Sequence, residues 1–221
     1  MPSKVTLVFS TGRRYNYFYR TSHSLLVNCT DLDRVSQVLI VDHGSSQLDI
    51  QRMLSIWPKA TFISWQGEEI SQKWDTLFSN ISTNYAFLMQ DDWEFVRGGD
   101  IISLGLKIME KDEAIKQVWL RYFPCPVVRH KALAYRLHMF RGDEVFGSPP
   151  DDYDSHWPGF TLNPSITDIR AVKALMPWPV GRKVERAMSL RWHLAGYRVA
   201  HTLDGYVKHI GTTTAFSAVK R

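Results

Sequence analysis

Short apolar runs alternate with longer amphipathic segments through the first half of the chain. Four apolar runs predict buried strands at residues 5–10, 37–41, 60–65 and 85–89. Between them, the pattern predicts helices at residues 15–27, 47–56 and 68–82, the last with a clear apolar stripe. Strands that alternate with helices are typical of a largely parallel sheet. This half is therefore expected to be an α/β unit.

The pattern becomes less regular after Phe95. It predicts a helix at residues 100–111, strands at 117–123, 134–140 and 160–162, and a helix from about 166 to 175, capped by Ser165 or Thr167. A helix at 182–195, ended by Gly196, precedes a last strand at 198–202. Residues 147–159 are typical of a loop. The second half is therefore expected to be α+β.

Length and composition fit one globular unit. The chain has 221 residues and is 44% hydrophobic, which is enough for one core. The formal net charge of +5 suits nucleic acid, a membrane surface or a phosphorylated ligand. No long Lys/Arg run exists, so no nucleic-acid partner is expected. Two cysteines, Cys29 and Cys125, exclude a disulfide framework. No apolar signal or membrane-spanning stretch is visible, so no transmembrane segment is expected and the cytoplasm is the expected location.

Two acids end the fourth apolar run. Asp91 and Asp92 follow residues 85–89 almost directly. Adjacent carboxylates at the mouth of a buried strand are costly unless something positive lies there, and a divalent cation is a usual partner. In open α/β sheets, ligands bind at the carboxyl ends of the strands. We therefore expect a metal and its ligand just past Met89; the alternative is a solvated turn.

Polar residues also follow the first two strands. Gly12 lets the backbone approach a ligand, and Arg13 and Arg14 are suited to clamp a phosphate or stack on a base. An ordinary turn with solvated arginines is the alternative. Asp42 can accept hydrogen bonds from a ribose or from the N–H of a pyrimidine. Its alternative role is a helix cap or an Asx-turn.

Further candidates lie late in the chain. Glu185 lies in the first turn of the helix at 182–195, where an acid also complements the helix dipole. His209 lies close to the end, where an ordinary histidine is the alternative. Asp151, Asp152 and Asp154 belong to the loop at 147–159, which is either a substrate-covering loop or an exposed acidic turn.

The order of these parts resembles the GT-A glycosyltransferases, which use nucleotide-diphosphate sugars and a divalent cation. The matching residues are Thr11-Gly12-Arg13, Asp42 with Gly44-Ser45, Gln90-Asp91-Asp92, residues 160–165, Glu185 and His209-Ile210-Gly211. The resemblance implies a GT-A fold: a Rossmann-like, mostly parallel central sheet flanked by helices, with a smaller α+β half. It also implies one domain over residues 1–221, with a nucleotide-sugar-binding half at 1–95 and an acceptor-side half at 96–221.

The resemblance implies a role for each matching residue. The residues that would contact the donor are Thr11, Gly12, Arg13, Asp42 and Asp91, with Asp42 at the base or ribose. Asp92 and His209 would bind the metal, and Glu185 would be the general base of an inverting transfer. A mixed oxygen and imidazole set suits Mn²⁺ better than Mg²⁺. Gln90 replaces the first acid of the family's D-x-D or E-D-D motif, so the role of that position does not carry over.

The implied reaction moves a sugar from a UDP-sugar to a hydroxyl of a glycan or glycoprotein, with Asp151, Asp152 and Asp154 as fallback bases. The parts are also similar to glycosyltransferases encoded by large algal DNA viruses, which would imply a host cytoplasm. One alternative is a sugar-nucleotide pyrophosphorylase, but residues 11–14 are too poor in glycine for its loop. Another is a non-catalytic carbohydrate- or nucleic-acid-binding module, which would leave the acids and His209 unexplained. Whether the chain is part of a longer multidomain protein stays open.

Overall fold

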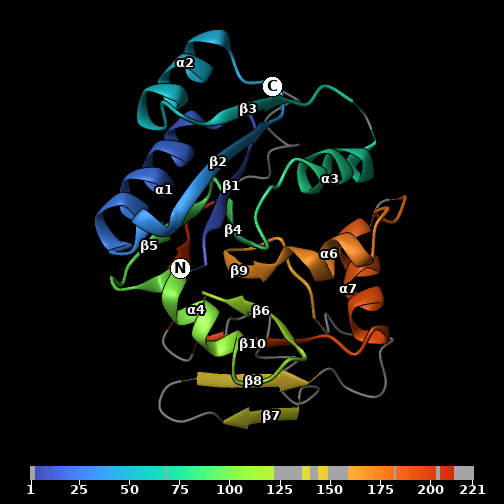
Figure 1. The fold of residues 1–221 in the computed structure, drawn as a ribbon. Coiled ribbons are helices and arrows are strands. Elements are labelled where there is room, and N and C mark those ends of the chain that lie inside the picture. Colours follow the sequence, from blue (N-terminus) through green and yellow to red (C-terminus); the bar gives the residue numbers. More distant parts are fainter. Residues whose placement is uncertain are drawn as a thin grey trace.

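A large twisted sheet forms the centre of the protein (Figure 1). The structure, a computed structural model, describes residues 3–67, 69–121, 136–139, 144–148, 159–181, 183–202 and 205–211. Within these residues the main sheet has nine strands in the order β3-β2-β1-β4-β9-β6-β10-β8-β7. The strands are β1 (Val5–Thr11), β2 (Val35–Asp42), β3 (Thr61–Ser64), β4 (Tyr85–Gln90), β6 (Ile115–Trp119), β7 (Arg136–Met139), β8 (Glu144–Ser148), β9 (Ser165–Asp168) and β10 (Arg198–Thr202). Only β8 and β9 run against the others, so the expected mostly parallel sheet is confirmed.

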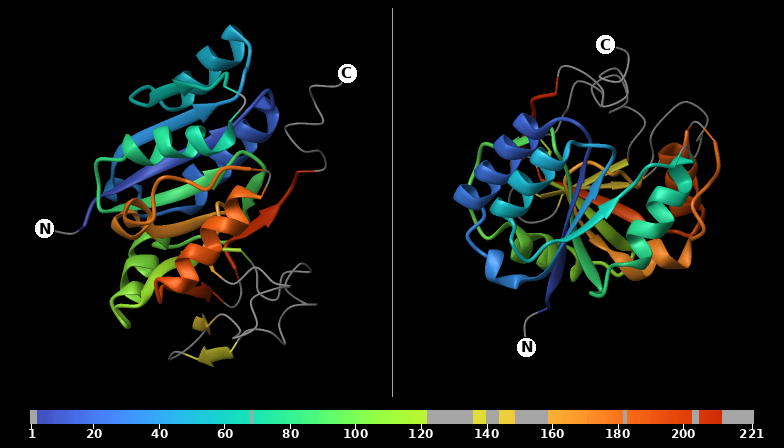
Figure 2. Two further views of the ribbon diagram at one scale, coloured as in Figure 1. Left: turned by 90° about the vertical axis from the view of Figure 1, so that its right-hand side faces the viewer. Right: turned by 90° about the horizontal axis from the view of Figure 1, so that it is seen from above.

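Helices cover both faces of this sheet (Figure 2). One face carries α1 (Tyr15–Asn28), α2 (Gln47–Ile56) and α4 (Ile101–Met109), and the other carries α3 (Ile70–Ser79), α6 (Ile169–Ala174) and α7 (Val184–Leu194). Side chains alternate between the two faces along a strand. Accordingly, Phe9 of β1 packs with Phe18 of α1, whereas Val8 belongs to the core on the other face with Leu77 of α3.

The strand register brings the carboxyl ends of β1, β2 and β4 level with one another. Thr11 lies opposite Asp42, and Ser10 lies opposite Gln90. The N–H of Asp91 donates to the carbonyl of Ser10 over 3.2 Å. The polar residues after these three strands therefore meet at one edge of the sheet, where open α/β sheets bind their ligands.

The elements predicted for the first half are confirmed, with small differences at their ends. The helix at 47–56 coincides with α2, because Ser46 caps it by accepting from the N–H of Asp49 over 3.2 Å. The helix predicted at 68–82 is shorter, since α3 covers Ile70–Ser79. Late in the chain, Gly196 follows α7 with a φ of +76°, a left-handed conformation that ends the helix as expected.

The helix predicted at about 166–175 is present as the shorter α6, but the strand, the helix start and the cap predicted for residues 160–168 were wrong. Residues 160–162 form no strand; the strand is β9, and α6 begins only at Ile169, capped by Asp168 rather than by Ser165 or Thr167. β9 is buried between β4 and β6 although it carries Ser165 and Thr167. The amide of Gln117 donates to both hydroxyls, over 3.1 and 2.9 Å. Their polarity is therefore satisfied inside the core, which the local sequence does not reveal.

A second, two-stranded sheet was not predicted, because its strands have only three residues each. β5 (Trp93–Phe95) pairs antiparallel with β11 (Val207–His209), so that His209 lies opposite Trp93. The N–H of Ile210 also donates to the carbonyl of Asp92 over 2.8 Å. This pairing brings residues 207–210 next to the acids that follow β4.

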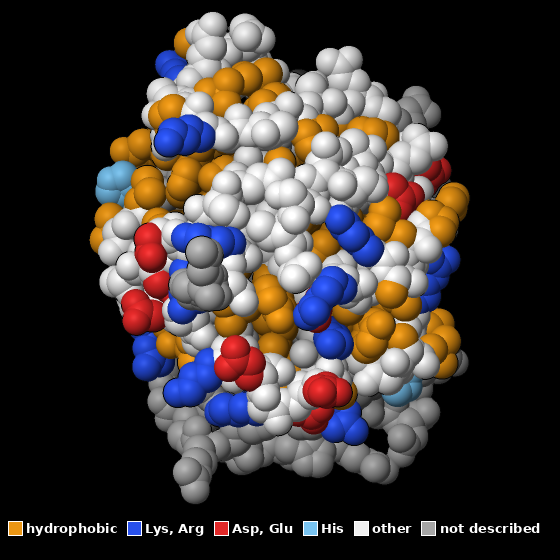
Figure 3. All heavy atoms as spheres, viewed as in Figure 1, with side chains coloured by type: hydrophobic (Ala, Val, Ile, Leu, Met, Phe, Trp, Pro, Cys, Tyr) orange, Lys and Arg blue, Asp and Glu red, His pale blue; other side chains and the backbone are white. Residues whose placement is uncertain are grey.

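The distribution of charge on the surface and the length of the helices bear on the expected partners of the chain. On the face drawn in Figure 3, Lys and Arg side chains alternate with Asp and Glu and form no continuous basic patch. None of the helices in the described ranges is long and apolar enough to cross a membrane.

Candidate functional site

The loops after β1 and β2 are held tightly together at the carboxyl edge. A Cβ on Gly12 would lie 3.1 Å from the carbonyl oxygen of His43, so a side chain here would push the two loops apart by a few tenths of an ångström. Arg13 has a φ of +54°. Its N–H donates to Ser45 Oγ over 2.9 Å, and its Nε donates to the carbonyl of Gly44 over 3.0 Å. Arg13 therefore links the two loops, and its exposed side chain borders the edge.

Asp42 is completely buried at the end of β2. Its carboxylate accepts from the N–H of Ser45 over 2.8 Å and from the Ser45 hydroxyl over 2.5 Å. These are local turn hydrogen bonds, but the backbone donor lies three residues on, so they are not the Asx-turn that the sequence left open, and the cap of α2 is Ser46 rather than Asp42. A carboxylate has about four acceptor positions, so this turn leaves capacity for a ligand donor.

Asp91 is as fully buried as Asp42. Thr11 Oγ1 donates to its Oδ2 over 2.8 Å. Arg14 pairs with both of its oxygens. Burial raises the pKa of Asp91 to about 6; Arg14 and Thr11 lower it, and the neighbouring Asp92 raises it. These contacts thus hold Asp91 in a fixed position inside the protein at the carboxyl edge of the sheet.

Asp92 and His209 lie together, as the sequence predicted from their motifs. The Nε2 of His209 is 3.4 Å from Oδ2 of Asp92, and the His209 side chain is 52% exposed. The other oxygen, Asp92 Oδ1, is buried and makes no hydrogen bond within the described residues. A Cβ on Gly211 would lie 2.6 Å from Asp92 Oδ2, so a glycine is needed beside this carboxylate.

These atoms fit a divalent cation as two ligands of an incomplete set. A buried carboxylate oxygen without a donor and a nearby imidazole are suitable ligands for Mn²⁺. Within the described residues, no group of three or more His, Cys, Asp and Glu side chains converges as a ready-made metal site. The described side chains thus offer two ligands, and a cation here would need further ones.

Lys73 also reaches this edge, and sequence analysis did not single it out. It lies on α3, is only 8% exposed, and donates from Nζ to Ser10 Oγ over 3.0 Å. Burial lowers its pKa to about 8, whereas the charges of Asp91 and Asp42 act in the opposite direction. A buried lysine that faces two acids at a ligand-binding edge is a candidate site residue. The only sequence signal was a charged residue inside an apolar helical stripe.

Glu185 lies in the first turn of α7, as predicted. Its Oε1 accepts from Thr161 Oγ1 over 3.0 Å and from the N–H of Leu162 over 2.8 Å. Burial raises its pKa, although these two hydrogen bonds and the charge of Arg121 lower it. Residues 161 and 162 come just before the start of β9, and Ser165 pairs with Leu88 near the carboxyl end of β4. Glu185 therefore belongs to the same edge of the sheet.

Some predicted residues cannot be placed. The fallback bases Asp151, Asp152 and Asp154 lie outside the described residues, as does Cys125. Cys29 is a buried free thiol, and its Sγ lies 3.3 Å from the carboxylate of Asp31, to which it donates.

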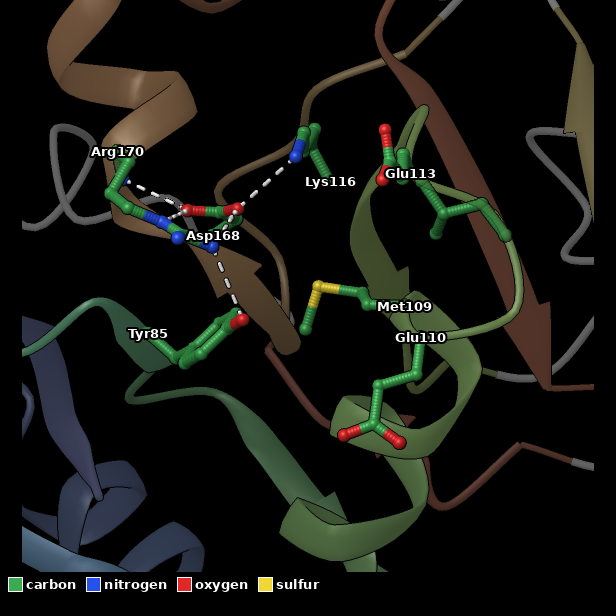
Figure 4. Close-up of a pocket in the computed structure, with 8 residues that line it drawn as sticks. Tyr85, Met109, Glu110, Glu113, Lys116, Asp168 and Arg170 are labelled. Carbon is green, nitrogen blue, oxygen red and sulfur yellow. Dashed lines mark hydrogen bonds and ion pairs between the residues drawn. The ribbon is translucent and has the colours of Figure 1, made fainter. Parts of the chain in front are cut away.

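A pocket of about 340 Å³ lies at the opposite edge of the sheet (Figure 4). It opens beside the first residues of β4 and β6, Tyr85 and Ile115. Asp168 holds Arg170 through bonds of 2.9 and 2.8 Å and Lys116 at 3.4 Å. The two positive charges thus share one carboxylate, and Glu110 and Glu113 also line the pocket. The pocket is therefore separate from the candidate site at the carboxyl edge.

The order of the strands, the helices on both faces and the acids after β4 define a GT-A fold, that of the nucleotide-sugar glycosyltransferases. A mannosyltransferase from Pyrobaculum calidifontis, in complex with GDP-Man and Mn²⁺, has a TM-score of 0.68 at 12% identity over 99% of this chain and 60% of that one. S. aureus TarS in complex with UDP-GlcNAc has a TM-score of 0.61 at 10% identity over 96% of this chain and 61% of that one. A mycobacterial protein has a TM-score of 0.64 at 12% identity over 96% of this chain.

The chain thus spans less than two thirds of the length of the mannosyltransferase and of TarS. No protein-family model matches the sequence, and no curated protein matches it. The similarity is one of fold, and the chemistry has to be argued from this chain's own residues.

Proposed function

We propose that the protein is a metal-dependent glycosyltransferase that moves a sugar from a UDP-sugar to a hydroxyl of a glycan or glycoprotein, with inversion. One observation carries the proposal. At the carboxyl edge of a GT-A sheet, Oδ2 of Asp92 lies 3.4 Å from Nε2 of His209, Oδ1 of Asp92 is buried without a partner among the described residues, and Asp42 lies near the buried Lys73. These are groups suited to a cation and to a nucleotide, at the place where this fold brings a donor.

Asp42 and Lys73 would bind the nucleobase. Uracil presents an N–H between two carbonyl groups, so it offers a donor to Asp42 and an acceptor to Lys73. Both side chains are buried, and a buried polar group discriminates strongly against ligands that leave it unpaired. The structural neighbours include complexes with GDP-Man and with UDP-GlcNAc. Guanine also offers a ring N–H beside a carbonyl, so the choice of uridine rests on the family resemblance.

Asp92 and His209 would hold Mn²⁺ at the donor's diphosphate. When bound, the cation would stabilise the negative charge that grows on the leaving diphosphate. Gly211 leaves room for the Asp92 carboxylate, and the pairing of β11 with β5 keeps His209 beside it. Thr11, Gly12 and Arg13 would line the approach of the donor.

Glu185 would take the proton from the acceptor hydroxyl. Both hydrogen bonds that hold its carboxylate end on Oε1, so Oε2 is the oxygen that we propose as the base. The raised pKa makes the carboxylate a stronger proton acceptor. A base on the far side of the sugar from the diphosphate drives a single displacement, which inverts the anomeric centre. In this proposal residues 1–95 bind the donor. Residues 96–221 bind the acceptor and supply His209 as a metal ligand.

Calorimetric titration with UDP, GDP and a short RNA tests this assignment. UDP is expected to bind in the presence of Mn²⁺, to bind much more weakly after chelation with EDTA, and to recover when Mn²⁺ is restored. Asp92→Ala should abolish the recovery. UDP binding that is indifferent to metal would contradict the role of Asp92, and tight RNA binding without nucleotide binding would favour a binding module.

A further inference from the structure

Arg14 forms an ion pair with each of the two acids that follow β4. Its NH1 is 3.1 Å from Oδ2 of Asp92, its Nε is 3.3 Å from Oδ2 of Asp91, and its NH2 pairs with Oδ1 of Asp91. The Arg14 side chain is only 11% exposed. Arg14 directly precedes α1. A single positive charge of the first loop therefore bridges both acids.

This arrangement places two cations in competition. The Asp92 oxygen that Arg14 contacts is the one that lies 3.4 Å from His209 Nε2. A cation held by Asp92 and His209 would therefore meet the positive charge of Arg14 at the same carboxylate. Because the site is partly buried, repulsion between these charges is only weakly screened. A metal that binds without nucleotide must therefore either displace Arg14 or bind against the repulsion of its positive charge.

We propose that Arg14 is the internal counter-ion of this site and transfers to the donor's diphosphate when a divalent cation takes over Asp92. This inference rests on the proposed function, which supplies the diphosphate. The planar guanidinium suits a phosphate as well as a carboxylate, so Arg14 exchanges one anion for another and stays paired throughout. The metal and the nucleotide must then bind with positive coupling, because the nucleotide accepts the arginine that the metal releases. By linkage, each improves the affinity of the other by the same factor.

The variant Arg14→Met separates the two roles of this side chain. Methionine keeps the apolar stem but removes the charge, and Arg20→Met is the matched control. Arg20 lies on the same α1, is half-exposed and pairs with Glu94 at 3.0 Å. Mn²⁺ affinity is measured by the electron paramagnetic resonance signal of free Mn²⁺, at pH 8 and without nucleotide. UDP affinity is then measured by calorimetry in saturating Mn²⁺.

Arg14→Met is expected to change the affinity for Mn²⁺ and the affinity for UDP in opposite directions. Without nucleotide, Arg14→Met should bind Mn²⁺ about tenfold more tightly than wild type, because the competing cation is gone. In saturating Mn²⁺, it should bind UDP about tenfold more weakly, because a charged contact to phosphate is lost. The coupling factor, of order 5–150 where sites are linked, should fall below that of wild type but stay above one, because Mn²⁺ still binds the diphosphate directly. Arg20→Met should match wild type in both measurements.

A merely structural role for Arg14 would weaken both ligands. Mn²⁺ binding by Arg14→Met that is equal to or weaker than wild type would therefore overturn the proposal. If this variant does not fold, Arg14→Lys replaces it, because one ammonium cannot bridge both acids; its Mn²⁺ affinity must still exceed that of wild type. If wild type binds no UDP, the proposed function and the transfer to phosphate both fail, whereas the Mn²⁺ affinities alone decide the counter-ion role.

Discussion

Replacing Lys73 by methionine should make the protein more stable and less able to bind its donor. Lys73 Nζ is buried on α3 and contacts Ser10 Oγ at 3.0 Å. Burial lowers the pKa of Lys73 from 10.5 to about 8 even though Asp91 and Asp42 favour its charge. The folded state therefore holds this ammonium at a net cost, which a ligand-binding role explains and a core position does not.

The magnitude follows from the lowered pKa. A tenfold change in proton affinity corresponds to about 1.4 kcal/mol, so the buried ammonium costs about 3 kcal/mol at pH 7. Methionine fills a similar volume without this cost, but it forfeits the hydrogen bond to Ser10, which is worth about 1 kcal/mol. Asp91 keeps Arg14 and Thr11 as partners. We therefore expect the free energy of unfolding to rise by about 2 kcal/mol at pH 7.

The dependence on pH gives a second check. Below pH 8 both the folded and the unfolded protein hold the lysine proton, so the full cost is present. Between about pH 8 and 10.5 the folded protein releases the proton while the unfolded chain keeps it, and the wild type loses this cost as pH rises. The advantage of Lys73→Met should therefore shrink across that range.

Urea unfolding at pH 7 and at pH 10 measures both effects. Lys107→Met, which removes an exposed lysine from α4, is the control and should show no such dependence on pH. A variant that unfolds at lower urea concentration than wild type at pH 7 would refute the reasoning, because the ammonium would then stabilise the fold.

Three further predictions concern other acids. Asp31 accepts from the N–H groups of Ile102 and Ser103 at the start of α4. Burial raises its pKa, but hydrogen bonds from the Ser103 hydroxyl, these two N–H groups and Cys29 together lower it more. Asp31→Asn should lower the free energy of unfolding by about 1–3 kcal/mol at pH 7, measured in urea. Wild type should lose stability as the pH falls below 4, where Asp31 takes up its proton, and the variant should not show this loss. Glu185→Gln should slow transfer about 10²–10⁴-fold with unchanged donor affinity, and NMR should find an inverted product; retention would remove the base role. Asp42→Ala should weaken UDP binding by about 1–3 kcal/mol in calorimetry, and GDP that binds wild type equally well would reject uridine.

The parts of the fold that were predictable are those with uninterrupted apolar runs. β1, β2 and β4 are buried strands whose runs stop abruptly at polar residues, so both the strands and the edge where Asp42 and Asp91 meet could be inferred from the sequence. β9 was missed because a buried strand with Ser165 and Thr167 resembles a capped helix start. Its burial depends on Gln117, 48 residues away from Ser165, and no local pattern reports such a distant hydrogen bond.

The candidate site was predictable only as a set of residue types. Asp92 and His209 were named from their motifs, but their distance depends on the pairing of β5 with β11, which are too short to give a pattern. Lys73 was missed because burial of a single charge is a tertiary property. The pairing of Arg14 with Asp91 and Asp92 joins positions 77 and 78 residues apart, and the sequence indicated only that Arg14 could serve an anion.

The central claim is that this edge of the sheet activates a nucleotide sugar, and turnover tests it most directly. The protein is incubated with Mn²⁺, a mixed pool of glycan and glycoprotein acceptors, and nucleotide sugars one at a time, and release of the nucleoside diphosphate is followed. We predict that a UDP-sugar is consumed, that EDTA stops the reaction, and that Asp92→Ala does not catalyse it. Consumption of no nucleotide sugar by the wild-type protein, or consumption that persists in EDTA and in Asp92→Ala, would contradict the account.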